Sequence, residues 1–213
     1  MNKINKTIDH TYLKADAGEK EIKRICWETL KYGFRSVCVN PEWVSLSKKE
    51  LKGKALVVTV IDWPCGASST NVRIFEAKQA KKDGADEIDP VIRIGQLKQK
   101  NYKIVFDDLK KLSKILPTKV IIETGFLSNK EIIKASNLVK KAGAICVKTS
   151  TGISPKVEID KKIKHVKLMR KTVGSKFLIK AAGGIRTLKD AERLLKAGAD
   201  IIGTSGSVSI AKE

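Results

Sequence analysis

The sequence of 213 residues predicts an α/β protein, a single-domain (β/α)8 TIM barrel with a short N-terminal extension. Three observations support this: helical and strand patterns alternate throughout, the strands are nearly continuous apolar runs, and no Pro/Ser-rich linker divides residues 1–213. Apolar strands of this kind belong to parallel sheets covered by helices, either a closed barrel or an open doubly wound sheet. Neither nucleotide-binding glycine motif, G-x-G-x-x-G or G-x-x-x-x-G-K-[ST], follows the first strand, so the barrel is favoured.

A repeated pattern locates four junctions between a helix and a strand. Each junction ends a helix on glycine and enters a short apolar run, in LKYGFRSVCV (30–39), KKDGADEIDP (81–90), KKAGAICVKT (140–149) and LKAGADIIGT (195–204). Glycine adopts the left-handed conformation that closes a helix. The fifth residue after each glycine is Cys38, Asp89, Lys148 or Gly203, so we expect these four residues at equivalent positions near strand ends.

Three further apolar runs and one short N-terminal segment complete the predicted strands. They lie at 6–10, 56–62, 119–124 and 176–184. Amphipathic helices are expected between the strands, and two helix starts are marked by capping residues: Ser128 with Glu131, and Thr187 with Asp190. Eight strands would close the barrel.

The composition indicates a globular protein with a strongly basic charge. Hydrophobic residues make up 42% of the chain, and 43 Lys and Arg against 23 Asp and Glu give a net charge of +20. Such a charge also suits a nucleic-acid-binding protein. The lysines are scattered over nearly every predicted helix, however, without a basic arm or a series of stacking aromatic residues. We therefore favour solvated helix faces that attract small anions, and expect no nucleic-acid partner.

Other patterns exclude several classes of protein. The four cysteines lack C-x-x-C spacing and the two histidines do not cluster with them, so we expect free thiols, no metal and no cofactor. No apolar run reaches the ~18 to 20 residues of a membrane span, and the N-terminal segment lacks the apolar stretch of a signal peptide. A cytoplasmic location without a membrane partner is expected.

Ionisable residues at strand ends are candidates for catalysis. Active sites of (β/α)8 barrels lie at the C-terminal ends of the strands, where Asp89, Lys148 and Lys180 are predicted. A free lysine has a pKa of about 10.4, whereas a nucleophilic amine at neutral pH needs about 7 to 8. A neighbouring positive charge on Lys180 would favour a neutral Lys148, which could then form a Schiff base with a carbonyl compound. Asp89 would transfer protons, or simply form an ion pair with Lys180.

Two glycine-rich turns indicate a phosphate site. Gly183 and Gly184 follow the seventh strand, and residues 203–207 follow the eighth and open a short final helix. Barrels of this kind often hold a phosphate at these two loops, through backbone N–H groups and a helix N-terminus. The predicted substrate is therefore a small phosphorylated carbonyl compound.

These residues lie in motifs that resemble one family, deoxyribose-phosphate aldolase, along essentially the whole chain. The motifs are IDHTYLK (8–14), SVCVNPEWV (36–44), GADEIDPVIRIGQL (84–97), KVIIETGFL (119–127), VKTSTG (147–152), KAAGGIRT (180–187) and IGTSGSV (202–208). The resemblance implies a metal-independent class I aldolase that cleaves 2-deoxy-D-ribose 5-phosphate to D-glyceraldehyde 3-phosphate and acetaldehyde in deoxynucleoside catabolism. It also implies a homo-oligomer, either a dimer or a tetramer.

The resemblance also assigns roles to individual residues. It implies that Lys148 forms the Schiff base and that Lys180 and Asp89 assist catalysis. The implied substrate-binding residues are Asp9, Cys38, Thr149, Gly183, Gly184, Gly203 and Ser205.

Several positions depart from the pattern of many relatives. Asp62 and Trp63 stand where relatives have glycine and phenylalanine, Pro90 follows the aspartate, Arg93 replaces asparagine, and GTSGS replaces GTSSG. Proline removes a backbone donor and could bend the strand. Two alternatives therefore stay open: a related lysine-dependent barrel lyase with altered aldehyde specificity, and a basic nucleic-acid-binding barrel protein.

Overall fold

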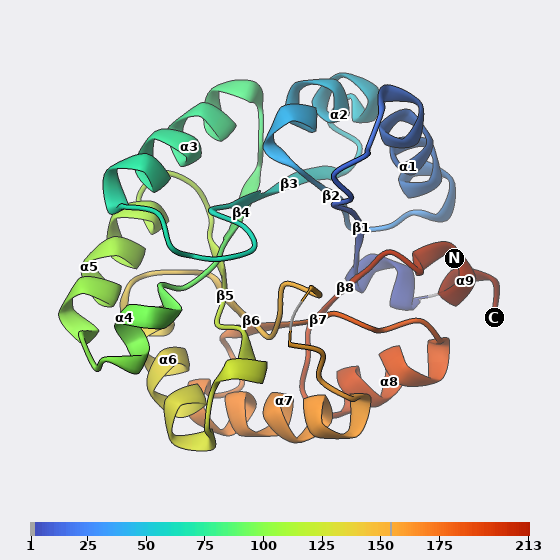
Figure 1. Ribbon diagram of the computed structural model, residues 1–213. Helices are drawn as coiled ribbons and strands as arrows, with labels where there is room; N and C mark the ends of the chain where they lie inside the picture. Colours follow the sequence, from blue (N-terminus) through green and yellow to red (C-terminus); the bar gives the residue numbers. More distant parts are fainter. Residues whose placement is uncertain (1–2, 154) are drawn as a thin grey trace.

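Eight parallel strands form one sheet in the computed structural model, which describes residues 3–153 and 155–213 (Figure 1). The strands are β1 (Ile8–Tyr12), β2 (Ser36–Val39), β3 (Leu56–Ile61), β4 (Glu87–Pro90), β5 (Lys119–Ile121), β6 (Cys146–Lys148), β7 (Leu178–Ala182) and β8 (Ile201–Thr204). Their order is β4-β3-β2-β1-β8-β7-β6-β5. Parallel bridges between Ile88 and Thr118 and between Val91 and Ile121 bring the two edge strands together. The predicted (β/α)8 barrel is confirmed.

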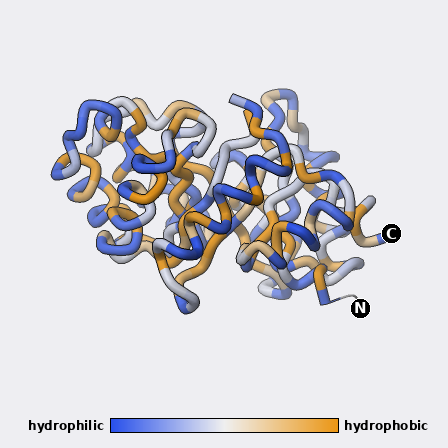
Figure 2. Tube along the Cα trace, turned by 90° about the horizontal axis from the view of Figure 1, so that it is seen from below, coloured by the Kyte–Doolittle hydropathy of each residue, from blue (hydrophilic) through white to orange (hydrophobic). Residues whose placement is uncertain are grey.

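Helices surround the strands as an outer ring (Figure 1). They are α1 (Glu19–Tyr32), α2 (Val44–Leu51), α3 (Thr70–Asp83), α4 (Ile94–Lys98), α5 (Tyr102–Ser113), α6 (Asn129–Lys141), α7 (Ile159–Val173), α8 (Leu188–Lys196) and α9 (Ser207–Lys212). Hydrophilic and hydrophobic residues alternate along these helices, as expected for helices that bury one face (Figure 2). No helix in the described part of the chain has both the length and the apolar character to cross a membrane.

The glycines of the repeated pattern close helices as predicted. Gly33, Gly84, Gly143 and Gly198 have φ angles of 68°, 101°, 85° and 111°, which is the left-handed region that side chains disfavour. Each of the strands that follow then begins within three residues. This local geometry sets which residues face the barrel interior.

The ends of four predicted strands differ from the structure, although the strand predicted at 56–62 differs by one residue only, because β3 ends at Ile61. The first strand is β1 at Ile8–Tyr12 rather than 6–10, because residues Lys3–Thr7 form a short 3-10 helix closed by a hydrogen bond from Thr7 Oγ1 to the Ile4 carbonyl at 2.7 Å. The strand predicted at 119–124 ends at Ile121, since Glu123 takes a φ of 50° and a 3-10 turn follows. The strand predicted at 176–184 ends at Ala182, before two glycines with positive φ.

Candidate active site

A layer of buried charged residues lies inside the barrel. In it, Asp89 from β4 lies between two lysines from neighbouring strands: its Oδ2 accepts hydrogen bonds from Lys148 Nζ at 2.8 Å and from Lys180 Nζ at 2.9 Å. Lys180 Nζ also donates to Asp9 Oδ2 at 2.5 Å. Lys148 and Lys180 are paired in register across β6 and β7. The structure thus brings together the three residues predicted to be catalytic.

The layer holds a third lysine, Lys119, that was not predicted from the sequence. Lys119 Nζ lies 2.5 Å from Glu87 Oε2, 3.0 Å from Asp89 Oδ1 and 3.8 Å from Asp9 Oδ2. Arg35 adds a fourth positive charge, 2.9 Å from Asp9 Oδ1. Strand alternation could have predicted Lys119. This lysine opens an apolar strand two positions before Ile121, so both side chains point to the same face of the strand.

The charge balance differs from the predicted pair of repelling lysines. Carboxylates of Asp9, Glu87 and Asp89 lie among the positive groups, so each lysine of the layer contacts at least one negative charge. Burial lowers the pKa of Lys180, but the charges of Asp89 and Asp9 outweigh it and hold the pKa well above its usual value. Lys180 is therefore the protonated partner that the sequence analysis expected, and Asp89 offsets its repulsion of Lys148.

Asp89 stays ionised despite complete burial. Burial raises the pKa of this carboxyl group, but Lys119, Lys148 and Lys180 together lower it well below its usual range. Pro90 does not displace Asp89, because Pro90 is the last residue of β4 and stays in register opposite Ile61. The backbone donor that proline lacks therefore falls at the end of the strand.

A cavity of 570 Å³ opens above this layer. Lys148 lines it together with four residues of the predicted phosphate loops, Gly183, Gly184, Gly203 and Ser205. Arg186, Lys14 and Arg24 add positive side chains to its wall, a charge that suits an anionic ligand. Lys119 and Lys180 are fully buried and do not line the cavity, whereas Lys148 is 3% exposed within it.

The remaining predicted site residues lie behind the cavity wall. Asp9, Cys38 and Thr149 are fully buried. Asp9 accepts hydrogen bonds from Lys180 and Ser36, and Thr149 exchanges hydrogen bonds with the backbone of Ala182, which fixes β6 against β7. Cys38 packs with Val58 and Val60, and burial raises the pKa of its thiol. These residues support the site without forming its surface.

Lys162 is a further positively charged residue near the site that was not predicted from the sequence. It is 2% exposed, comes from α7 and donates a hydrogen bond to the Gly183 carbonyl. Burial lowers the pKa of its amine, against the opposing charges of Glu123 and Glu158. By donating to the Gly183 carbonyl, Lys162 helps to fix this loop.

The residues that depart from the pattern of relatives have different surroundings. Trp63 lines the cavity, but Asp62 accepts hydrogen bonds from Ser68 N at 3.0 Å and Ser68 Oγ at 2.9 Å within its own loop. Arg93 Nη1 lies 3.5 Å from Thr70 Oγ1. Of the serines in GTSGS, Ser205 lines the cavity and Ser207 is buried, 2.9 Å from His10 Nδ1.

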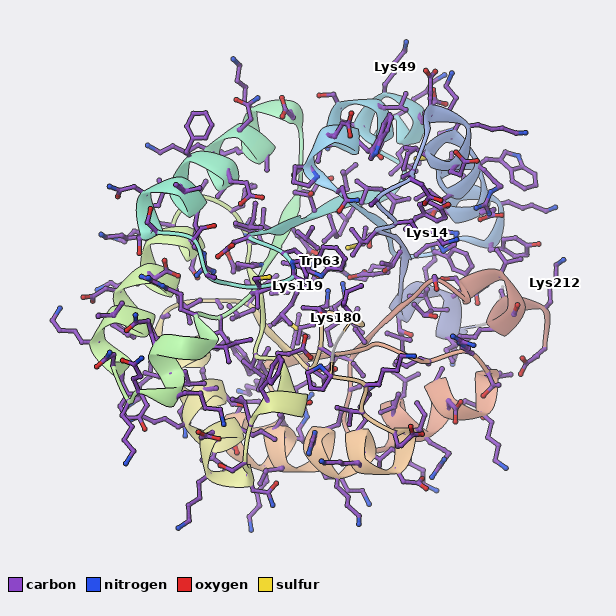
Figure 3. All side chains as sticks on the ribbon, viewed as in Figure 1. Lys14, Lys49, Trp63, Lys119, Lys180 and Lys212 are labelled. Atoms are coloured by element: carbon purple, nitrogen blue, oxygen red, sulfur yellow. The ribbon has the colours of Figure 1, made fainter. Side chains whose placement is uncertain are left out.

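Surface lysines are spread around the outside of the barrel. Lys49 at the top right and Lys212 at the right of the view extend outward from the periphery, whereas Lys119 and Lys180 lie near the barrel axis (Figure 3). Within the described residues, no group of three or more His, Cys, Asp or Glu side chains is arranged to hold a metal ion.

Known proteins match this chain along almost its whole length. A model of the DeoC/LacD aldolase family matches residues 3–209. A deoxyribose-phosphate aldolase of Caldicellulosiruptor saccharolyticus is 48% identical, over 99% of this chain and 97% of its own. Among solved structures, the aldolase QR15 has a TM-score of 0.94 at 37% identity, covering 100% of this chain and 96% of its own. A tetrameric deoxyribose phosphate aldolase from Aeropyrum pernix has a TM-score of 0.87 at 28% identity, covering 98% and 89%.

Proposed function

This chain belongs to the DeoC/LacD family of aldolases, and we propose that it reversibly cleaves 2-deoxy-D-ribose 5-phosphate to D-glyceraldehyde 3-phosphate and acetaldehyde. The reaction proceeds through a Schiff base on Lys148. One observation carries the proposal: of the three lysines clustered with Asp89, Lys148 is the one that lines the cavity. A substrate aldehyde in that cavity can therefore reach the amine of Lys148 but not those of Lys119 and Lys180.

The chemical steps follow from an amine beside a shared carboxylate. The Lys148 amine attacks C1 of the open-chain sugar, and loss of water gives a protonated imine. A base removes the proton of the C3 hydroxyl, the C2–C3 bond breaks, and its electron pair moves into the imine to give an enamine. Glyceraldehyde 3-phosphate leaves with C3 as its aldehyde carbon. Protonation of the enamine at C2 and hydrolysis then release acetaldehyde and restore Lys148.

Asp89 and Lys180 are assigned to the proton transfers. Both Lys148 and Lys180 donate to the same oxygen of Asp89, so a proton leaving Lys148 has an acceptor within hydrogen-bond distance. Asp89 reaches the C3 hydroxyl through a water molecule, and the positive charges of Lys119, Lys148 and Lys180 keep Asp89 ionised between transfers.

The phosphate group binds at the glycine loops after β7 and β8. Gly183 and Gly184 have φ angles of 86° and 71°, so a side chain at either position would be strained. Ser205 and Arg186 line the same part of the cavity, and α9 begins at Ser207 directly after it. A phosphate there receives backbone N–H groups and a positive side chain.

Reduction with borohydride tests the Schiff base. With 2-deoxy-D-ribose 5-phosphate present, borohydride should attach a carbon chain to Lys148 irreversibly, and peptide mass spectrometry should find the adduct there. Lys148→Met should lose the label and lower kcat by on the order of 10³-fold or more. Lys14→Met is the matched control, since Lys14 also lines the cavity but has no carboxylate of the layer beside it, and it should keep the label. An adduct that persists in Lys148→Met would contradict the assignment.

Three finer features of the function remain proposals. The chain forms a homo-oligomer, a proposal supported by the tetrameric structure of the Aeropyrum pernix relative. Gel filtration with light scattering tests it. It acts in the cytoplasm, where phosphorylated sugars are retained. It needs neither a metal nor a cofactor, because the protonated imine serves as the electron acceptor, so activity should survive treatment with a chelator.

A further inference from the structure

A buried histidine, His10, connects helix α1 to the loop that follows β8. It lies on β1, is 3% exposed and lines the cavity. Its Nε2 lies 2.8 Å from Glu28 Oε2, and its Nδ1 lies 2.9 Å from Ser207 Oγ. Both ring nitrogens therefore have polar partners within the protein, which favours a structural role over proton exchange with a substrate.

The direction of these hydrogen bonds follows from the chemistry of the partners. A carboxylate can only accept, so His10 Nε2 carries a hydrogen and donates to Glu28. Burial lowers the pKa of His10, because it disfavours the charged form of the ring. The neutral ring has no hydrogen on Nδ1, which therefore accepts from the Ser207 hydroxyl. Arg24 Nη1 donates to Glu28 Oε1 at 2.8 Å, so the carboxylate that holds the ring is itself held.

Ser207 joins the histidine to the loops proposed to bind phosphate. It is fully buried, whereas residues 203–206, which precede it, all line the cavity. Ser207 Oγ also lies 3.0 Å from the Thr204 carbonyl oxygen. Thr204 Oγ1 donates to the Ile185 carbonyl at 2.6 Å and accepts from Gly206 N at 2.9 Å. The loop after β8 is thus tied to the loop after β7, and His10 anchors it to β1.

The consequence for binding rests on the proposed function, in which the phosphate group binds at these two loops. A loop that binds through backbone N–H groups loses affinity if its backbone must first become ordered, because that ordering costs free energy. We propose that His10 is a positioning residue that holds the loop after β8, through Ser207, in the conformation that binds phosphate. The preference for a phosphorylated sugar then depends on both residues.

Two sugars that differ only in the phosphate group test this role. The ratio of kcat/KM for 2-deoxy-D-ribose 5-phosphate to that for 2-deoxy-D-ribose measures the phosphate preference, and within one variant it is independent of how much enzyme is folded. Ser207→Ala removes the hydroxyl, and His10→Leu removes both ring nitrogens. Each should lower kcat/KM for the phosphorylated sugar by about five- to tenfold, mainly through a higher KM. For 2-deoxy-D-ribose the change should stay within about twofold.

His10→Asn separates the contact with Ser207 from the contact with Glu28. The asparagine side chain places a polar atom near the position of Nδ1 but is too short to reach that of Nε2. It should therefore keep most of the phosphate preference that His10→Leu loses. The double variant His10→Leu/Ser207→Ala should lose about as much preference as either single variant, because both changes break the same link.

His165→Leu is the matched control for loss of a buried histidine outside the site. His165 lies on α7, is 4% exposed and does not line the cavity. Its phosphate preference should equal that of the wild type.

Each other outcome has a distinct meaning. Equal losses for the two sugars in Ser207→Ala and His10→Leu, or no loss for either sugar, would overturn the inference while leaving the aldolase activity established by the wild type. A loss of preference in His10→Leu that Ser207→Ala does not share would also overturn it, because His10 would then act without Ser207. If the wild type cleaves neither sugar, the proposed function itself is contradicted, and the role of His10 falls with it.

Discussion

At the scale of single residues, the Lys180 side chain occupies space that only a glycine at position 203 leaves free. A Cβ atom at Gly203 would lie 2.8 Å from Lys180 Cε and 3.2 Å from Ala182 Cβ, closer than packed carbon atoms approach. Gly203 also pairs with Asp9 across β8 and β1, so it lies directly beside the ion pair between Lys180 and Asp9. Its role in the structure is to leave room for the Lys180 side chain, in addition to any role in binding phosphate.

We therefore expect Gly203→Ala to displace Lys180 from Asp89. The variant should lose at least about tenfold in kcat/KM and about 1 to 3 kcal/mol in the free energy of unfolding, as in other overpacked cores. Steady-state kinetics and urea unfolding measure the two effects. Gly95→Ala is the control, because Gly95 lies in α4 with no atom within 4 Å of an added Cβ; its activity should be unchanged and its stability equal or higher. Full activity in Gly203→Ala would contradict the steric argument.

At the scale of secondary structure elements, local capping signals set where helices begin. Ser128 precedes α6, and its Oγ accepts a hydrogen bond from Glu131 N at 3.3 Å while Glu131 Oε2 accepts from Ser128 N at 2.8 Å. The hydrogen bond from Ser128 N to the Glu131 carboxylate, with those from Lys98 and Ser128 Oγ, lowers the pKa of Glu131 to about 2. Ser69 occupies the corresponding position before α3 but makes no side-chain capping bond. The same residue type thus caps one helix and not the other.

This contrast gives a stability prediction with a control inside the same protein. Ser128→Ala should lower the free energy of unfolding by about 1 kcal/mol, because it removes an acceptor for an N–H group of the first turn. Ser69→Ala should change it by less than about half as much, since no side-chain hydrogen bond is lost. Urea unfolding of both variants measures the difference, and equal losses would show that the capping bond of Ser128 is not what stabilises α6.

At the scale of the whole molecule, the charged layer joins strands from all sides of the barrel. It links Asp9 of β1 and Asp89 of β4 to Lys119, Lys148 and Lys180 of β5, β6 and β7. Burying charges is costly unless they are paired, and removing one partner leaves the others uncompensated. The barrel interior is therefore stable only while both signs of charge are present.

The stability of the fold should consequently depend on pH in a defined way. The pKa values of Asp9 and Asp89 are lowered in the folded state, so their contribution is complete above about pH 4, the unfolded value, and is lost as pH falls through the folded values. The pKa values of Lys119 and Lys180 are raised, so their contribution is complete below about pH 10 and is lost as pH rises through the folded values. In urea unfolding measured between about pH 4 and about pH 10, the contribution of this layer to the free energy of unfolding should stay constant.

Lys119→Met tests which positive charge controls the loss of folding stability at low pH. Burial raises the pKa of Asp89, and Lys119 is the strongest of the charges that lower it. Without Lys119, the folded-state pKa of Asp89 should lie closer to its unfolded value, so the acid-induced loss of stability should be smaller and should be complete at a higher pH than in the wild type. Lys103→Met, which removes an exposed lysine paired with Asp107 on α5, should leave the pH dependence nearly unchanged. If the acid-induced loss of stability had the same size and ended at the same pH in Lys119→Met and the wild type, this account would be contradicted.

The sequence by itself determined the alternation of helices and strands, the glycines that close four helices, and the placement of Asp89 and Lys148 near strand ends. These features follow from local rules, because a left-handed glycine fixes where the next strand starts and strand alternation fixes the facing of its residues. The resemblance to relatives extended this to the substrate and to residues such as Asp9, whose roles remain proposals. Local rules were less reliable at strand ends, where Glu123 and the 3-10 helix at Lys3–Thr7 shortened or shifted the predicted strands.

Only the tertiary structure decided how the charges of the site are balanced. Asp9 and Lys180 are separated by 171 positions in the chain, yet their side chains are 2.5 Å apart, and Lys119 joins them from a third strand. It also decided that Trp63 lines the cavity while its neighbour Asp62 bonds to its own loop. The physical reason is the same in each case. Burial and Coulomb energy depend on which side chains come into contact when the barrel closes, and the local sequence does not specify those contacts.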